Sequence, residues 1–161
     1  MNCAAIVQCA DGIDNDGDGA IDAADPDCSS ANDDTEAAVC FDGFPNAAAQ
    51  ATVIGLLQPG TTTMAADSIC PSDDQDWFNV TAVHANTSVQ ATLTATSAGD
   101  VNLCVYSASV SLIACSTNIT GPDSVTVATP NNSGETYLLL VLGASVPGQT
   151  SYQLVVTASS L

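Results

Sequence analysis

From residue 40 onward, hydrophobic and polar residues follow a pattern that predicts β-strands. Short runs rich in Val, Leu, Ile and Thr are separated by clusters of Gly, Pro, Asn, Asp and Ser. Residues 89–96 and 123–127 alternate between apolar and polar, which places one face of each strand in a core and the other in water. Residues 137–142 are almost continuously apolar, as is typical of a central strand covered on both faces. We therefore predict strands at 51–57, 62–69, 75–83, 87–96, 100–107, 110–116, 123–129, 135–143 and 151–158.

This number and spacing of strands predict an all-β fold. Eight or nine short strands separated by turns favour a jelly-roll-like antiparallel β-sandwich over a parallel sheet. Residues 1–39 have a different composition, because most of the acidic residues lie before residue 43. The chain is therefore expected to contain an N-terminal segment, residues 1–39, and a β-sandwich domain, residues 40–161.

The N-terminal segment contains a candidate calcium loop. Residues 9–28, CADGIDNDGDGAIDAADPDC, hold seven aspartates, and the chain has no lysine or arginine to pair with them. From position 14 the run reads D-x-D-x-D-G-x-x-D-x-x-D, the ligand spacing of a twelve-residue calcium loop. Hard oxygen donors in a flexible loop suit Ca²⁺ better than Mg²⁺, and the loop offers no Cys or His for zinc. The predicted ligands are the side chains of Asp14, Asp16, Asp18, Asp22 and Asp25 and the carbonyl of Ala20.

The loop departs from the EF-hand pattern in two ways. Asp25 stands where a bidentate glutamate is usual, and two cysteines, Cys9 and Cys28, bracket the loop in place of helices. This arrangement resembles the calcium repeats of thrombospondin type 3 and similar bacterial extracellular segments. Asp11 and Asn15 either hold a second ion or cap the turn. The alternative for the whole run is a solvated acidic linker.

Net charge and cysteine content limit the partners and the location of the chain. A net charge of −18 argues against nucleic acid or an anionic membrane as a partner. No stretch approaches the ~20 apolar residues of a membrane span, so membrane insertion is not expected. Seven cysteines in 161 residues indicate an oxidising compartment, which predicts an extracellular or cell-surface location.

The strand plan suggests how the cysteines pair. Cys104 and Cys115 lie on adjacent predicted strands, close enough for a bridge across a hairpin. Cys9 with Cys28 would close the calcium loop, and Cys40 with Cys70 would tie the start of the domain to a later strand. Since six cysteines allow 15 pairings, these pairs are hypotheses. Cys3 is left over and is the candidate for an intermolecular disulfide.

Several segments of the domain together resemble a known family. FPNAAAQA at residues 44–51, DDQDWFNV at 73–80 and VNLCVY at 101–106 are followed by ETYLLLV at 135–141 and SYQLVV at 151–156. In this order they resemble the bacterial pre-peptidase C-terminal domain, a β-sandwich appended to many secreted proteins, over about residues 40–161. The resemblance implies a non-catalytic binding or spacer role. GETY at 134–137, in place of glycine-tyrosine-tyrosine, is a mild departure.

Individual polar and aromatic residues add little that is specific. For Trp77 we favour packing over ligand stacking, and for His84 an exposed turn over catalysis. Acids at 73, 74, 76 and 100 are expected in solvated turns, with a second cation site as the alternative. Sequons mark four candidate glycosylation sites, at Asn79, Asn86, Asn118 and Asn131.

Two classes of non-enzymatic function remain. Catalysis is not expected, because the chain has one histidine, no lysine or arginine and no nucleophile or nucleotide-binding motif. The favoured hypothesis is a calcium-stabilised structural subunit of an extracellular filament, sheath or surface assembly. It would self-associate through the apolar residues 4–7 and Cys3. The alternative is an accessory carbohydrate- or protein-binding or adhesion module of a secreted hydrolase system.

Overall fold

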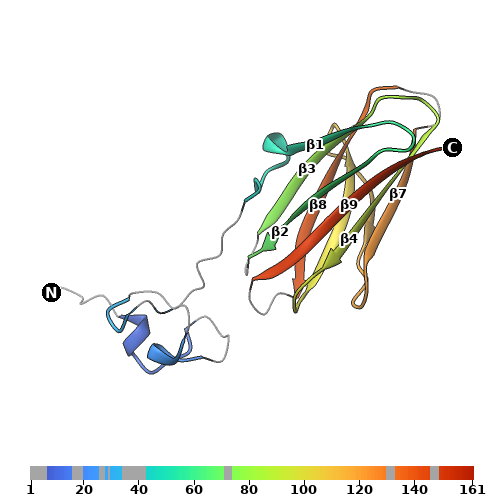
Figure 1. Ribbon diagram of the computed structural model, residues 1–161. Helices are drawn as coiled ribbons and strands as arrows, with labels where there is room; N and C mark the ends of the chain where they lie inside the picture. The colour runs from blue at the N-terminus through green and yellow to red at the C-terminus, as the bar shows by residue number, and fades with distance from the viewer. Residues whose placement is uncertain are drawn as a thin grey trace. The chain divides into compact units, whose positions relative to one another are not determined.

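The chain divides into two compact units, Met1–Cys40 and Phe41–Leu161 (Figure 1). The structure is a computed structural model that describes residues 7–15, 20–25, 28, 30–33, 43–70, 74–129, 133–145 and 149–161. The first unit contains two short 3-10 helices, η1 (Gln8–Ala10) and η2 (Asp22–Ala24). The second unit is a two-layered β-sandwich, preceded by a third short helix, η3 (Ala48–Gln50).

The sandwich is built from a five-stranded and a four-stranded sheet. The first sheet has the order β1-β3-β8-β5-β6, and the second has the order β2-β9-β4-β7. Their bounds are β1 Thr52–Leu57, β2 Thr62–Ile69, β3 Gln75–Ala82, β4 Thr87–Ala95, β5 Asp100–Ser107, β6 Leu112–Ser116, β7 Asp123–Thr129, β8 Glu135–Ser145 and β9 Thr150–Ser160.

The predicted antiparallel β-sandwich is confirmed, with one exception in its pairing. Each predicted strand is present, with ends within two residues of those expected. β1 and β3, however, run parallel, with a register shift between Val53 and Gly55. The intervening strand β2 belongs to the other sheet, so the chain returns to the first sheet in its original direction.

A hydrophobic core fills the space between the two sheets. Phe78, Leu103 and Leu139 of the five-stranded sheet face Tyr152 and Leu154 of the four-stranded sheet, and all are fully buried. The central strand β8 is covered on both faces, as its continuous apolar sequence predicts. Its alternate residues belong to a second cluster on the outer face of the five-stranded sheet.

Side-chain hydroxyls connect the two sheets along both open sides of the sandwich. On one side, the Thr63 hydroxyl of β2 donates a hydrogen bond to the carbonyl of Ile54 in β1. On the other side, the Ser116 hydroxyl of β6 donates to Oδ1 of Asp123, at 2.6 Å, and accepts from the backbone N–H of Ser124, at 3.2 Å. These contacts join edge strands that belong to different sheets.

Disulfides add covalent links to this framework. Cys104 and Cys115 are bonded across β5 and β6, with their Cα atoms 4.1 Å apart, as predicted. Cys70 is also disulfide-bonded. Its predicted partner, Cys40, lies outside the described residues. Among the residues that the structure describes, no helix is long and apolar enough to cross a membrane.

Two acids that we expected in solvated turns are instead buried. Asp76 is fully buried and accepts a hydrogen bond from the Tyr152 hydroxyl, while Asp74 accepts one from the Cys70 N–H at 2.7 Å. The expectation was wrong because the parity of β3 turns Asp76 toward the core, where a phenol is available as a donor. Asp100 is half-buried and lines a cavity of about 240 Å³ at the end of the sandwich, and Asp73 lies outside the described residues.

Replacing Tyr152 by Phe should destabilise the sandwich by about 1–3 kcal/mol, because a buried carboxylate would lose a hydrogen-bond donor. Urea unfolding of the two proteins measures this difference. The matched control is Tyr106→Phe, which removes a hydroxyl from a half-buried ring on the outer face. Equal losses in the two variants would contradict the role assigned to the Tyr152 hydroxyl.

Stability should also fall in mild alkali. Burial, with a smaller effect of Glu135, raises the pKa of Tyr137 to about 12, and burial with the Asp76 hydrogen bond raises the pKa of Tyr152 as well. Both contributions are fully present below the ordinary tyrosine pKa of about 10 and are lost as pH rises toward the folded-state values. The free energy of unfolding should therefore be lower at pH 11 than at pH 9, and Tyr137→Phe should reduce the difference. Equal stability at the two pH values would contradict this assignment.

Candidate calcium-binding segment and the outer face of the sandwich

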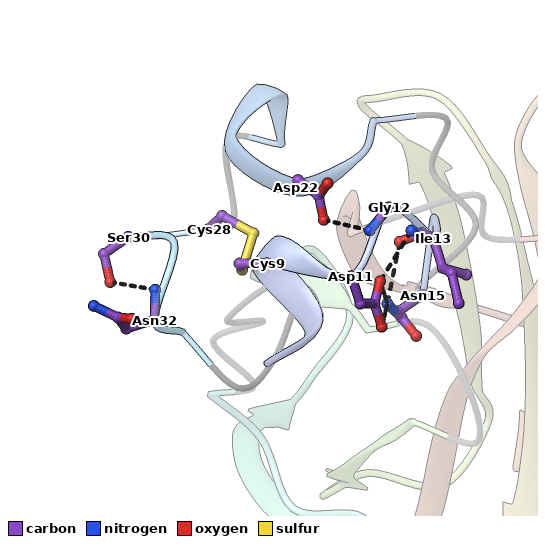
Figure 2. Close-up of a disulfide and its surroundings, with 9 residues drawn as sticks. All are labelled: Cys9, Asp11, Gly12, Ile13, Asn15, Asp22, Cys28, Ser30 and Asn32. Atoms are coloured by element: carbon purple, nitrogen blue, oxygen red, sulfur yellow. Dashed lines mark hydrogen bonds between the residues drawn. A yellow bond between two sulfur atoms is a disulfide. The ribbon is translucent and has the colours of Figure 1, made fainter. Parts of the chain in front are cut away.

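A disulfide closes the acidic segment of the first unit. Cys9 and Cys28 are bonded, with Cα atoms 5.7 Å apart, as predicted, and Cys9 is buried in the middle of η1 (Figure 2). Closing a loop of this length is worth about 3 kcal/mol in the chain-entropy model. The bond therefore restricts the acidic residues to a small volume in which their charges repel one another.

Asp11 and Asn15 cap the turn that begins the segment. Oδ1 of Asp11 accepts hydrogen bonds from the Ile13 N–H at 2.9 Å and from Nδ2 of Asn15 at 3.1 Å (Figure 2). The Asn15 amide also donates to the Ile13 carbonyl at 3.1 Å. Of the two roles that the sequence leaves open for this pair, these contacts are those of a turn cap.

Asp22 connects the predicted loop to the turn that precedes it. Its Oδ1 accepts a hydrogen bond from the Gly12 N–H at 3.0 Å, ten residues earlier in the chain (Figure 2). Its backbone lies in the left-handed region, at φ 50°, and η2 begins here. The Asp22 carbonyl accepts from the Asp25 N–H at 2.9 Å, which fixes the backbone of the last predicted ligand.

Asp25 is the most deeply buried acid among the described residues of this segment. Only 3 % of its surface is exposed, whereas Asp14 and Asp22 are half-buried. A buried carboxylate is costly unless a partner or a bound cation stabilises its charge. Because the chain has no lysine or arginine and a single histidine, few protein cations are available for this purpose.

The structure describes four of the six residues predicted to bind calcium. Asp14, Ala20, Asp22 and Asp25 are described, whereas Asp16 and Asp18 lie outside the described residues. Within the described part of the chain, no three His, Cys, Asp or Glu side chains converge closely enough to hold an ion. The donors themselves, carboxylate and carbonyl oxygens, are those that Ca²⁺ prefers.

The sequence predicted that the strand at 137–142 is covered on both faces, but not which residues form the second apolar cluster, on the outer face of the five-stranded sheet. Its buried members are Trp77, Leu138, Leu140 and Cys104, with Tyr106 and Leu142 packed against them. The Trp77 and Tyr106 rings lie 5.2 Å apart between centroids, and the Trp77 indole N–H donates to Oε1 of Gln75 at 3.2 Å. Trp77 is thus a packing residue, as favoured from the sequence, and Tyr106 presents a half-buried ring beside it.

Asn102 lies on the same face and carries a buried acceptor. Its Oδ1 atom is enclosed by the protein but accepts no hydrogen bond from any described residue. Asn102 faces outward because side chains alternate along β5. Val101, Leu103 and Val105 fill the core, so residues 102, 104 and 106 lie on the outer face. The alternation was visible in the sequence, but which face the neighbouring strands would line was not.

His84 and three of the four sequons lie in the described part of the sandwich. His84 is exposed, and its carbonyl accepts a hydrogen bond from the Thr87 hydroxyl at 2.8 Å. Asn79 is half-buried in β3, and Asn86 is exposed in the turn before β4. Nδ2 of the exposed Asn118 donates to the Pro122 carbonyl at 3.1 Å, and Asn131 lies outside the described residues.

Comparison with known proteins shows likeness only at the level of the fold. No family model and no curated protein matches the chain. Among solved structures, the pre-peptidase C-terminal domain of collagenase from Bacillus anthracis is 15 % identical, with a TM-score of 0.49, over 68 % of this chain and 94 % of that one. The Yersinia pseudotuberculosis-derived mitogen is 13 % identical, with a TM-score of 0.47, over 60 % and 85 %. A carbohydrate-binding module, CBM36 in complex with calcium and xylotriose, is 15 % identical, with a TM-score of 0.38, over 64 % and 93 %.

Each of two aspartate substitutions should speed hydrogen exchange of a different backbone amide. Asp11→Ala removes the acceptor of the Ile13 N–H, and Asp22→Ala removes that of the Gly12 N–H. At about 0.5–1.5 kcal/mol per hydrogen bond, each should speed hydrogen exchange of its own amide by roughly 2- to 10-fold. NMR-detected exchange measures both amides in one sample. Equal acceleration of both amides by either substitution would contradict these two separate contacts.

Proposed function

We propose that this chain is a non-catalytic binding module of a secreted or cell-surface protein, with an N-terminal segment stabilised by calcium. The observation that carries the proposal is the buried Asp25 carboxylate in a disulfide-closed acidic segment of a chain that lacks lysine and arginine. A bound cation would stabilise this carboxylate and reduce the repulsion among its neighbours.

Calcium is the cation that fits the spacing of the donors. Asp14, Asp16, Asp18, Asp22 and Asp25, with the Ala20 carbonyl, would hold it, and it would supply charge neutralisation and cross-linking of the loop. The contact between Asp22 and Gly12 supports this assignment, because it holds a predicted ligand close to the turn that precedes the loop. Asp11 and Asn15 would act from outside the site by fixing the first turn.

The cysteines support an extracellular location. Two disulfides join described residues, one in each unit, and Cys70 takes part in another. Disulfides persist in oxidising compartments and are rare in the cytosol. A calcium-binding segment fits the same environment, since extracellular calcium modules typically bind with dissociation constants of about 10⁻⁴–10⁻³ M.

The non-catalytic role follows from how the polar groups of the sandwich are used. Asp76 and Asp123 accept hydrogen bonds from strands of the facing sheet, and Asp74 accepts one within the connection between β2 and β3. The one histidine is exposed in a turn and contributes a backbone carbonyl to its surroundings. The side chains that usually perform acid–base chemistry are thus used here for structure.

The binding-module hypothesis is better supported than the structural-subunit hypothesis. It has a specific surface to offer, the outer face of the five-stranded sheet, where the half-buried Tyr106 ring lies beside Trp77. Assembly through the N-terminal residues and Cys3 stays a prediction, because residues 1–6 lie outside the described residues. Glycosylation at the sequons likewise stays a prediction.

Calorimetric titration with calcium tests the proposed site. The wild-type chain should bind at least one ion, and Asp25→Asn should weaken binding at least tenfold, which corresponds to about 1.4 kcal/mol. The matched control is Asp33→Asn, which removes the same charge outside the predicted loop and should retain nearly wild-type affinity. An absence of binding heat, or equal losses in the two variants, would overturn the calcium assignment.

A further inference from the structure

A cavity of about 240 Å³ opens at the end of the sandwich where β5 begins. Its lining comes from the end of β4, the turn after it, the start of β5 and the turn between β6 and β7. The apolar part of this lining consists of Leu93, Ala95, Val101, Ile119 and Pro122. The half-buried Asp100 is the one ionisable side chain among the described residues that line it. The cavity therefore combines apolar walls with a single carboxylate.

Hydrogen bonds to β9 hold one wall of the cavity in place. The backbone N–H of Ser151 donates to Oγ of Ser97 at 2.7 Å, and the Thr150 hydroxyl donates to the carbonyl of Ala98 at 2.9 Å. Gly99 lies at φ 126°, and a Cβ at this position would collide with the Thr150 hydroxyl. The turn thus lies tightly against β9, which fixes the backbone of the acid that follows it.

A buried aspartate holds the other wall. Oδ1 of Asp123 accepts hydrogen bonds from the Ser116 hydroxyl at 2.6 Å and from the Asn118 N–H at 2.7 Å. Nδ2 of Asn118 donates to the Pro122 carbonyl at 3.1 Å. These contacts close the turn that carries Ile119, whose side chain is 85 % exposed at the rim of the cavity. Both walls are therefore formed before a ligand binds, which lowers the entropic cost of binding.

The size and lining of the cavity favour a single basic side chain as its occupant. Sites for small molecules and cofactors measure roughly 300–1,000 Å³, so this cavity is smaller than a typical one. Lysine and arginine have the chemistry that the lining requires, because each has an apolar stem and a charged head. The stem would pack against the apolar walls. The head would pair with the Asp100 carboxylate, which accepts no hydrogen bond from any described residue.

The chain has no such side chain of its own to place in the cavity. It contains no lysine or arginine, and a second copy would bring none either. A Ca²⁺ ion takes about six to eight oxygen ligands, more than one carboxylate supplies. The net charge of −18 repels anionic partners and attracts cationic ones over a distance. The occupant that suits the cavity is therefore a basic side chain of another protein.

The geometry points to a docking site for a partner protein that inserts a lysine or arginine side chain into this cavity, with Asp100 as the residue that pairs with the cation. Ile119 at the rim would contact apolar residues beside the inserted side chain. This inference rests on the proposed role as a binding module and names the chemistry of a protein partner. It adds a site at the end of the sandwich to the surface on the outer face of the five-stranded sheet.

NMR titration of the full chain with short peptides tests this site. The probes are the acetylated and amidated tripeptides Leu-Lys-Leu and Leu-Arg-Leu, with Leu-norleucine-Leu as the uncharged comparison. At least one basic peptide should give saturable shifts in the amides of residues 93–101 and 118–121, and the norleucine peptide should bind at least tenfold more weakly. Sodium chloride at about 150 mM screens charges farther apart than about 8 Å, which suppresses general attraction to the acidic chain.

Two matched acid substitutions separate the cavity from the overall charge. Asp100→Asn should weaken binding of the basic peptide at least fivefold, because it removes the charge and keeps the shape of the side chain. The control is Glu135→Gln, which neutralises a half-buried acid at the other end of β8 and should retain nearly wild-type affinity. Since Asp100 pairs with Ser145, the two acids lie roughly 33 Å apart along β8 at ~3.3 Å per residue.

Ile119→Ala is a second variant that leaves folding intact, because its side chain is 85 % exposed. It should weaken peptide binding at least twofold without lowering the melting temperature. n-Butylammonium, which is the lysine side chain without a peptide, should bind more weakly than the lysine peptide because it does not reach Ile119.

Four results would each overturn the inference. They are an absence of saturable shifts at the cavity, equal binding of the norleucine peptide, equal losses in Asp100→Asn and Glu135→Gln, and n-butylammonium binding as tightly as the peptide. The last result would assign the cavity to a free amine. Calcium titration of the same preparation, followed at the amides of Gly12 and Ile13, tests the calcium-stabilised segment independently of these outcomes.

Discussion

No lysine or arginine balances the 18 acidic residues of this chain, and several of the carboxylates that the structure describes accept hydrogen bonds from N–H and O–H groups instead. In the sandwich, the Tyr152 hydroxyl holds Asp76, the Cys70 N–H holds Asp74, and the Ser116 hydroxyl holds Asp123. Hydrogen bonds to a charged acceptor are about twice as strong as those between neutral groups. They also fix direction, so each of these carboxylates connects two segments of chain.

This constraint has different consequences in the two units. The sandwich has a large apolar core and well-paired strands, so a few buried carboxylates can be accommodated by nearby donors. Among the described residues of the N-terminal unit, Cys9 is the one buried hydrophobic side chain, and acids lie within a loop that a disulfide closes. Backbone donors reach Asp11 and Asp22, but the density of negative charge remains. A divalent cation is the simplest agent that would relieve it, which is why the proposed function gives calcium a structural role.

The sequence predicts the sandwich well because its strands follow a local pattern. Alternation in 89–96 and 123–127 is a property of neighbouring residues, and strands appear where it occurs. The parallel pairing of β1 with β3 was not predictable, because it depends on β2 crossing to the other sheet. The burial of Asp76 and the orphaned acceptor of Asn102 were missed for a similar reason: both depend on which side chains distant strands bring alongside.

Scanning calorimetry in calcium chloride, against sodium chloride of equal ionic strength, tests most directly whether an external cation completes this structure. With dissociation constants of about 10⁻⁴–10⁻³ M, 10 mM calcium should add roughly 1.4–2.7 kcal/mol to the stability of the unit that binds it. The account predicts that at least one unfolding transition moves to higher temperature in calcium by a few degrees. Superimposable transitions in the two salts would show that the carboxylates need only screening, and would contradict the account.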